Sequence, residues 1–112
     1  MKHLSPHLTL KRVAAALLAT VAVCSVQAQQ TADELHKRAT AAMCSNCHGT
    51  EGRTVEGSAI PSLVGMPKDY HVLQMQAFKN GTRPATVMHQ ITKGLTDAQI
   101  DTIASYYAAI KR

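Results

Sequence analysis

The stretch Cys44-Ser45-Asn46-Cys47-His48 decides the fold, because two cysteines and a histidine at this spacing form a C-x-x-C-H motif. Two thiols one helical turn apart can each form a thioether with a vinyl group of haem, and the adjacent histidine then lies beneath the iron as an axial ligand. The motif therefore predicts one covalently bound haem c, held by Cys44 and Cys47 and ligated by His48.

Two other chemistries use paired cysteines, namely a dithiol redox pair and one half of a zinc site. A zinc site needs a second pair of ligands, but no cysteine follows Cys47, and His71 and His89 do not have the spacing of zinc ligands. A redox pair of the thioredoxin kind accompanies a βαβ pattern, which this sequence lacks. Attachment of haem is therefore the favoured interpretation.

Residues 1–28 have the pattern of a cleavable secretory signal peptide. Basic residues precede an apolar run over 13–23, and Val26-Gln27-Ala28 is typical of a cleavage site that ends at Ala28. The apolar run is shorter than the roughly twenty residues that span a bilayer, so no permanent membrane anchor is expected. We expect export to the periplasm, since haem is joined to thiols outside the bacterial cytoplasm, in an oxidising compartment.

Residues 29–112 are expected to form one small monohaem domain. Nine Lys and Arg stand against seven Asp and Glu in this range, a net charge of +2, and the two haem carboxylates would bring the charge near zero. No cluster of basic residues interleaved with aromatic residues follows residue 28, which argues against nucleic-acid binding. A domain of this size builds a small apolar core, so haem is expected to supply much of the interior.

Helical patterns account for most of this domain, and no segment resembles a strand. The predicted helices are 31–46 with Thr31 as N-cap, a helix opened by Pro67 and stopped at Asn80-Gly81, a short helix or turn over 86–93, and a last helix capped by Thr96 with Gln99 completing the capping box. The fold class is therefore expected to be all-α.

Two further features concern how these helices surround the cofactor. The span 49–65 is rich in Gly, Ser and Thr and is expected to be a loop along one edge of the haem. One face of the last helix should pack on the first helix; it consists of Ile100, Ile103, Ala104, Tyr107 and Ala108.

Taken together, these motifs resemble those of class I c-type cytochromes over nearly the whole of residues 29–112. Pro61-Ser62-Leu63 is similar to the P-x-L loop of that family, whose proline carbonyl accepts a hydrogen bond from Nδ1 of the ligating histidine. The resemblance implies that Pro61 orients His48, which fixes the tautomer of the ring and raises its basicity as a ligand. A rigid turn is the other role open to a proline at this place.

Met88 is predicted to be the second axial ligand of the iron. The run 69–88 resembles the distal half of small bacterial members of the family, in which the methionine is the sixth ligand. Met88 follows His48 by forty positions and lies on a short segment between Pro84 and Gly94, which could cover the opposite face of the haem. A packing methionine is the alternative role.

Four other residues are weaker candidates for this ligand. Met43 lies on the helix that carries the C-x-x-C-H motif, Met66 precedes a helix-opening proline, and Met75 lies inside a helical pattern, where methionine usually fills the core. His89 follows Met88 directly on a helical turn, so it is expected to point about 100° away, toward the surface.

A haem with histidine and methionine ligands has both axial positions filled, so it carries one electron and binds no substrate. The sequence also lacks a pair of catalytic carboxylates, a nucleophile with its base and a phosphate-binding loop. Electron transfer without catalysis is therefore the predicted function.

The strings Gly65-Met66-Pro67-Lys68-Asp69-Tyr70, 78–88 and 91–97 are similar to the cytochrome subunits of flavocytochrome c sulfide dehydrogenases. That resemblance implies a partner, a flavoprotein subunit that oxidises sulfide at FAD and passes electrons to the haem. A free-standing periplasmic cytochrome that shuttles electrons between respiratory complexes is the alternative. A haem gas sensor, or an enzyme with an open iron, is a third class.

Overall fold

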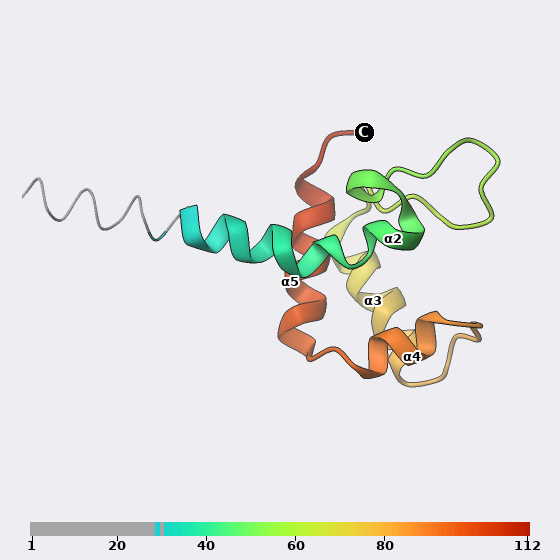
Figure 1. Ribbon diagram of the computed structural model, residues 1–112. Coiled ribbons are helices and arrows are strands. Elements are labelled where there is room, and N and C mark those ends of the chain that lie inside the picture. The colour runs from blue at the N-terminus through green and yellow to red at the C-terminus, as the bar shows by residue number, and fades with distance from the viewer. Residues whose placement is uncertain (1–28, 30) are drawn as a thin grey trace, which may run out of the picture. The chain divides into compact units, whose positions relative to one another are not determined.

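The computed structural model describes Gln29 and residues 31–112. The predicted signal peptide, 1–28, lies outside the described residues. Residues 36–112 form one compact unit, and the described residues before His36 belong to a separate unit and are helical. Every regular element in the described part of the chain is a helix, so the expected all-α class is confirmed (Figure 1). No helix there is both long and apolar enough to cross a membrane.

A helical segment over 31–42 is followed by a turn at Met43 and Cys44. The later elements are α2 (Ser45–His48), the 3-10 turn η1 (Thr50–Gly52), α3 (Lys68–Lys79), α4 (Met88–Lys93) and α5 (Asp97–Ala109). Helix α3 packs against both α4 and α5, and the span between η1 and α3 is a loop, as expected.

Helix α5 contributes four of the nine buried apolar residues that form the core of the described chain. Ile100, Ile103, Ala104 and Tyr107 of the predicted apolar face are fully buried, whereas Ala108, its fifth member, is half-buried. The hydroxyl of Tyr107 donates a hydrogen bond of 2.8 Å to the carbonyl oxygen of Ala41. The expected packing of the last helix on the first is therefore present within residues 36–112.

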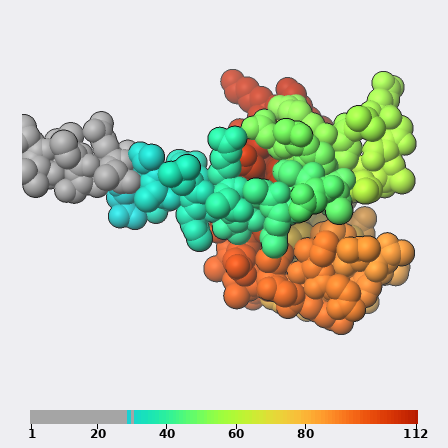
Figure 2. All heavy atoms as spheres, in the orientation of Figure 1, coloured from blue at the N-terminus to red at the C-terminus, as the bar shows by residue number. Residues whose placement is uncertain are grey.

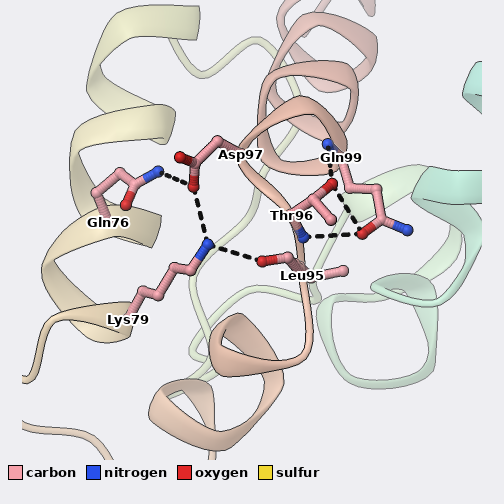
Figure 3. A network of polar contacts seen from close by, with 6 residues as sticks. All are labelled: Gln76, Lys79, Leu95, Thr96, Asp97 and Gln99. Atoms are coloured by element: carbon pink, nitrogen blue, oxygen red, sulfur yellow. Dashed lines mark hydrogen bonds and ion pairs between the residues drawn. The ribbon is translucent and has the colours of Figure 1, made fainter.

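The start of α5 has the predicted capping box and is also tied to the end of α3 (Figure 3). The backbone N–H of Gln99 donates to the side chain of Thr96 at 3.2 Å, and the Gln99 side chain accepts from the backbone of Thr96 at 2.9 Å. The carboxylate of Asp97 accepts hydrogen bonds from Lys79 at 2.8 Å and from Gln76 at 3.0 Å. These two bonds, that of Lys79 foremost, lower the pKa of Asp97.

The prediction of one helix over 31–46 is wrong at both ends. Gln29 and Thr31 are already helical, so Thr31 does not cap this helix. At the other end, the N–H of Cys44 donates to the carbonyl oxygen of Ala41, three residues back, at 3.1 Å. The same oxygen accepts the hydroxyl of Tyr107, so contact with α5 coincides with a tightened turn that separates α2 from the preceding helix.

The other boundaries differ from the predictions by one or two residues. Pro67 is the N-cap of α3 rather than its first residue. Helix α4 begins at Met88 instead of residue 86, and its C-cap is Gly94 as expected. The predicted stop at Asn80 is confirmed, since Asn80 is the C-cap of α3.

Candidate functional site

The C-x-x-C-H motif occupies the turn after residue 42 and the whole of α2. Both thiols are free; Cys44 is half-buried and Cys47 is exposed. Gly49 follows His48 with a φ of 79°, and a Cβ at this glycine would lie 2.1 Å from the carbonyl oxygen of Arg53. Only glycine therefore allows the chain to turn directly after His48 and enter η1.

His48 is 8% exposed, and its Nδ1 lies 2.7 Å from the carbonyl oxygen of Pro61. Because a carbonyl oxygen only accepts, the contact fits the tautomer with the hydrogen on Nδ1. Nε2 then keeps its lone pair, and the orientation of the ring is fixed by a backbone group from a distant loop. This is the arrangement of a histidine prepared to bind a metal through Nε2.

The loop that carries Pro61 is fixed through Gly52. The carbonyl oxygen of Gly52 accepts hydrogen bonds of 2.8 Å from the hydroxyl of Ser62 and from the backbone N–H of Leu63. Gly52 is buried with a φ of 75°, and a Cβ here would lie 2.6 Å from the ring of Tyr107. The contact of Gly52 with α5 thus holds in place the loop whose Pro61 carbonyl oxygen binds His48.

A cavity of about 550 Å³ lies beside the motif. Its volume falls within the range of about 300–1,000 Å³ found for cofactor and ligand sites. All five predicted site residues line it: Cys44, Cys47, His48, Pro61 and Met88. Figure 2 shows the green surface of residues 45–60 above the orange surface of 83–93, the two parts of the chain that contribute most of these residues.

The cavity wall is mostly apolar, and Arg83 is the sole Lys, Arg, Asp or Glu among the residues that line it. The guanidinium carbon of Arg83 lies 4.5 Å from the centre of the Phe78 ring. The guanidinium also donates a hydrogen bond to Oε1 of Gln74. The one cation of the wall is therefore held against α3 by a stacking contact and a hydrogen bond.

Met88 is half-buried at the first position of α4. The fully buried Thr92 donates its hydroxyl to the carbonyl oxygen of Met88 at 2.8 Å, which fixes the backbone at this point. Met43, Met66 and Met75 line the same cavity, so lining alone does not distinguish Met88 from the other methionines.

The expectation that His89 points to the surface is met only in part. Its side chain is half-buried, and its Nδ1 is buried without a hydrogen-bond partner among the described residues. His89 does not line the cavity, and its Nε2 lies 3.1 Å from Nε2 of Gln90 in an exposed contact.

Sequence reasoning also missed His71, which lies on α3 and lines the cavity. The side chain is 3% exposed, and burial together with the charge of His48 lowers its pKa to about 4. A signal was present in the sequence, since His71 precedes the core residue Met75 by four positions and therefore lies on the same face of the helix.

The donor set and the shape of the cavity fit haem c. Two thiols, a histidine with Nε2 left available and a methionine thioether surround one apolar space. Within the described residues, no group of three or more His, Cys, Asp or Glu is arranged to hold a metal ion, so Cys44 and Cys47 have no zinc-type companions there.

Comparison with known proteins agrees with this fit. Residues 30–106 match the family model described as cytochrome c oxidase, cbb3-type, subunit III. The cytochrome subunit of sulfide dehydrogenase from Chlorobaculum tepidum is 39% identical over 69 residues, which are 62% of this chain and 61% of that protein. A thiosulfate dehydrogenase electron acceptor from Thiomonas intermedia is 37% identical over 63% of this chain and 33% of its own length.

Among solved structures, a cytochrome c4 of Acidithiobacillus ferrooxidans matches with a TM-score of 0.57 and 37% identity. The match covers 60% of this chain and 38% of that structure. The chain thus spans between about a third and three fifths of the length of these relatives.

The fold and the site define a small class I c-type cytochrome with covalently bound haem c. The family model covers residues 30–106, well over half of the chain, so the chain belongs to that cytochrome family.

Proposed function

We propose that this protein transfers single electrons through one haem c whose iron is bound by His48 and Met88. The observation that carries the proposal is the shared cavity, in which the half-buried Met88 and a histidine with an engaged Nδ1 line the same apolar space. The bound haem supplies reversible one-electron chemistry at its iron.

Each residue of the site has a distinct part in this proposal. Cys44 and Cys47 tie the cofactor to the chain through thioethers, and Pro61 keeps the ring of His48 in its binding orientation. Thr92 holds the backbone of Met88, so the thioether reaches the iron from a fixed segment. The apolar wall excludes water, and filled axial positions leave no place for a substrate.

Replacement of Met88 tests the ligand assignment. Met88→Ala should abolish the sulfur-to-iron charge-transfer absorption of the oxidised protein, lower the midpoint potential and open the iron to carbon monoxide, because a thioether ligand would be lost. Met66→Ala and Met75→Ala, which change other methionines of the same wall, are the matched controls and should retain the absorption band. Loss of the band in either control, with Met88→Ala unchanged, would reject Met88 as the ligand.

The place of action that we propose is the periplasm, after cleavage of residues 1–28. The basic, apolar and small-residue pattern of these positions supports export, as does the need to attach haem to thiols outside the cytoplasm. The intact mass of the purified holoprotein tests this, since it should correspond to residues 29–112 plus one haem. A mass that includes the first 28 residues would contradict it.

The partner that we propose is a flavoprotein subunit that oxidises sulfide at FAD. Support comes from the relative named as the cytochrome subunit of sulfide dehydrogenase and from the strings at 65–70, 78–88 and 91–97. A second candidate is a free carrier that accepts electrons from another dehydrogenase, which the relative named as a thiosulfate dehydrogenase electron acceptor favours.

The salt dependence of electron transfer separates the two candidates. Residues 29–112 carry a net charge of +2 before the haem carboxylates are added, so docking should depend on apolar contact rather than on long-range steering. The rate of reduction by the candidate flavoprotein should therefore change little with ionic strength, and a flavoprotein should copurify from native periplasm. A steep, monotonic fall of the rate with salt would favour the free carrier.

A further inference from the structure

Arg83 follows α3 by four residues, and its backbone is tied to the end of that helix. The chain turns at Gly81, whose φ of 76° favours glycine. The backbone N–H groups of Gly81 and Arg83 donate to the carbonyl oxygens of Phe78 and Ala77 at 3.2 and 3.1 Å. The hydroxyl of Thr82 donates to the same oxygen of Ala77 at 3.2 Å. This turn brings Arg83 back alongside α3.

The guanidinium of Arg83 is held by two residues on the side of α3 that faces the cavity. Gln74 and Phe78 lie one helical turn apart, and both line the cavity. The guanidinium carbon is 4.5 Å from the centre of the Phe78 ring, and Nη1 donates to Oε1 of Gln74. The cation of the wall is therefore positioned before any ligand binds, which lowers the entropy cost of binding one.

Most of the hydrogen-bonding capacity of this guanidinium is unused. Arginine carries five N–H donors in a planar fork, and the contact with Gln74 engages one of its nitrogens. The ion pairs of α3 and α5 join Lys68 with Asp101 and Lys79 with Asp97, and no Asp or Glu in the described part of the chain is within ion-pair distance of Arg83. The remaining donors suit a carboxylate, which a guanidinium binds through two parallel hydrogen bonds.

Haem c carries two carboxylates, and the wall of its cavity is mostly apolar. An ionised carboxylate is strongly disfavoured in apolar surroundings unless it is paired or hydrated. Arg83 offers both conditions at one point of the wall, since it is a positioned cation and is itself exposed to solvent. No other Lys or Arg lines the cavity among the described residues.

We propose that Arg83 binds a carboxylate of the haem and neutralises its charge, with Gln74 and Phe78 as positioning residues. This inference rests on the proposed binding of haem c in this cavity and is independent of which residue is the sixth ligand. An unneutralised carboxylate stabilises the oxidised haem, which carries one more positive charge than the reduced haem. The pair with Arg83 therefore raises the midpoint potential.

The experiment compares holoprotein variants at pH 7 by resonance Raman spectroscopy, in which the bending band of the haem carboxylates reports their hydrogen bonds. Arg83→Leu removes the charge and the donors, so the band should shift. Lys93→Gln removes an exposed cation at the end of α4 that does not line the cavity, and it should leave the band in place.

A redox titration of the same variants gives a second measurement. At the midpoint potential of the unaltered protein, Arg83→Leu should raise the ratio of oxidised to reduced haem several-fold, because a carboxylate loses its counter-charge. Arg83→Lys retains a charge at this position and should shift the ratio less.

An unchanged carboxylate band in Arg83→Leu would overturn the proposal, and so would an equal shift in Lys93→Gln. If Arg83→Leu does not take up haem, Arg83→Lys provides the test, because an ammonium lacks the planar fork; an unchanged band in that variant would overturn the proposal as well. Failure of the proposed function would be seen separately, as a missing sulfur-to-iron charge-transfer absorption in the unaltered protein.

Discussion

The face of α5 and the wall of the cavity differ in how their apolar residues are covered. Ile100, Ile103 and Tyr107 on α5 are completely buried by other parts of the chain. In contrast, Tyr70 and Val87 line the cavity and remain 51% and 55% exposed. The chain by itself thus buries the apolar face of α5. The apolar side chains of the cavity wall stay partly exposed, and the haem is expected to cover them.

This difference shows which contacts each region depends on. The α5 region is held by close packing, by the bond from Tyr107 to Ala41 and by the polar network at its N-terminus (Figure 3). The cavity wall is held by separate hydrogen bonds, such as those of His48 with Pro61 and of Thr92 with Met88, and several of its apolar side chains remain half exposed. We therefore expect cofactor loss to damage the whole fold, and changes in the α5 region to reduce stability without changing the haem chemistry.

The largest effect is expected from removal of both thiols. The double variant Cys44→Ala with Cys47→Ala should contain no covalent haem and should be largely unfolded, because the cavity wall would lose the surface that covers it. Far-ultraviolet circular dichroism and the haem content of the purified protein measure this. Asn46→Ala, at an exposed position on the same short helix, is the control and should retain haem. Native helicity in the double variant without haem would show that the protein core suffices.

An intermediate effect is expected from Tyr107→Phe. This change removes the hydroxyl that donates to the carbonyl oxygen of Ala41, and the free energy of unfolding should fall by about 1 kcal/mol, since the N–H of Cys44 still satisfies that oxygen. Chemical denaturation of the holoprotein measures the loss. Tyr106→Phe keeps the edge-to-face ring contact with Tyr107 and should change stability less.

Within the same comparison, the absorption spectrum and midpoint potential of Tyr107→Phe should equal those of the unaltered protein. A spectral change as large as that of Met88→Ala would mean that packing in the α5 region also determines the haem chemistry.

The smallest effect is expected from Asp97→Asn. The hydrogen bonds from Lys79 and Gln76 lower the pKa of Asp97, so its ionised form favours the folded state. This contribution is present above the unfolded pKa of about 3.9 and is lost as the pH falls through the lower native pKa. Thermal unfolding should therefore show a slightly lower Tm for Asp97→Asn at pH 7, and the difference should vanish in acid.

Glu56→Gln, on the exposed loop, is the control for the removal of a surface carboxylate and should leave Tm unchanged at both pH values. A difference for Asp97→Asn that persists at pH 2 would assign the effect to helix capping geometry rather than to charge.

The parts of the fold that local sequence signals determine were predictable. The capping box at Thr96 and the end of α3 at Asn80 each depend on residues within one turn, and both occur where the pattern indicates. The break at Cys44 was not predictable, because it coincides with a carbonyl shared with Tyr107, a residue that is distant in the sequence.

The same distinction holds for the site. The grouping of the five predicted residues around one cavity followed from the motif and from a family resemblance. The burial of His71 and of Nδ1 of His89 depends on which helix face meets a neighbouring helix. A helical pattern shows which residues share a face but not which helix packs against that face. The burial of these two histidines therefore became visible only in the tertiary structure.

The bond from Tyr107 to Ala41 also bears on the order in which the protein folds. It joins residues 66 positions apart, and every residue of the haem site lies inside the loop that it closes. Closing a loop of this length costs on the order of 4 kcal/mol of chain entropy, which the contact must repay. Until this contact forms, the thiols of Cys44 and Cys47 lie on an open loop, together with His48, Pro61 and Met88.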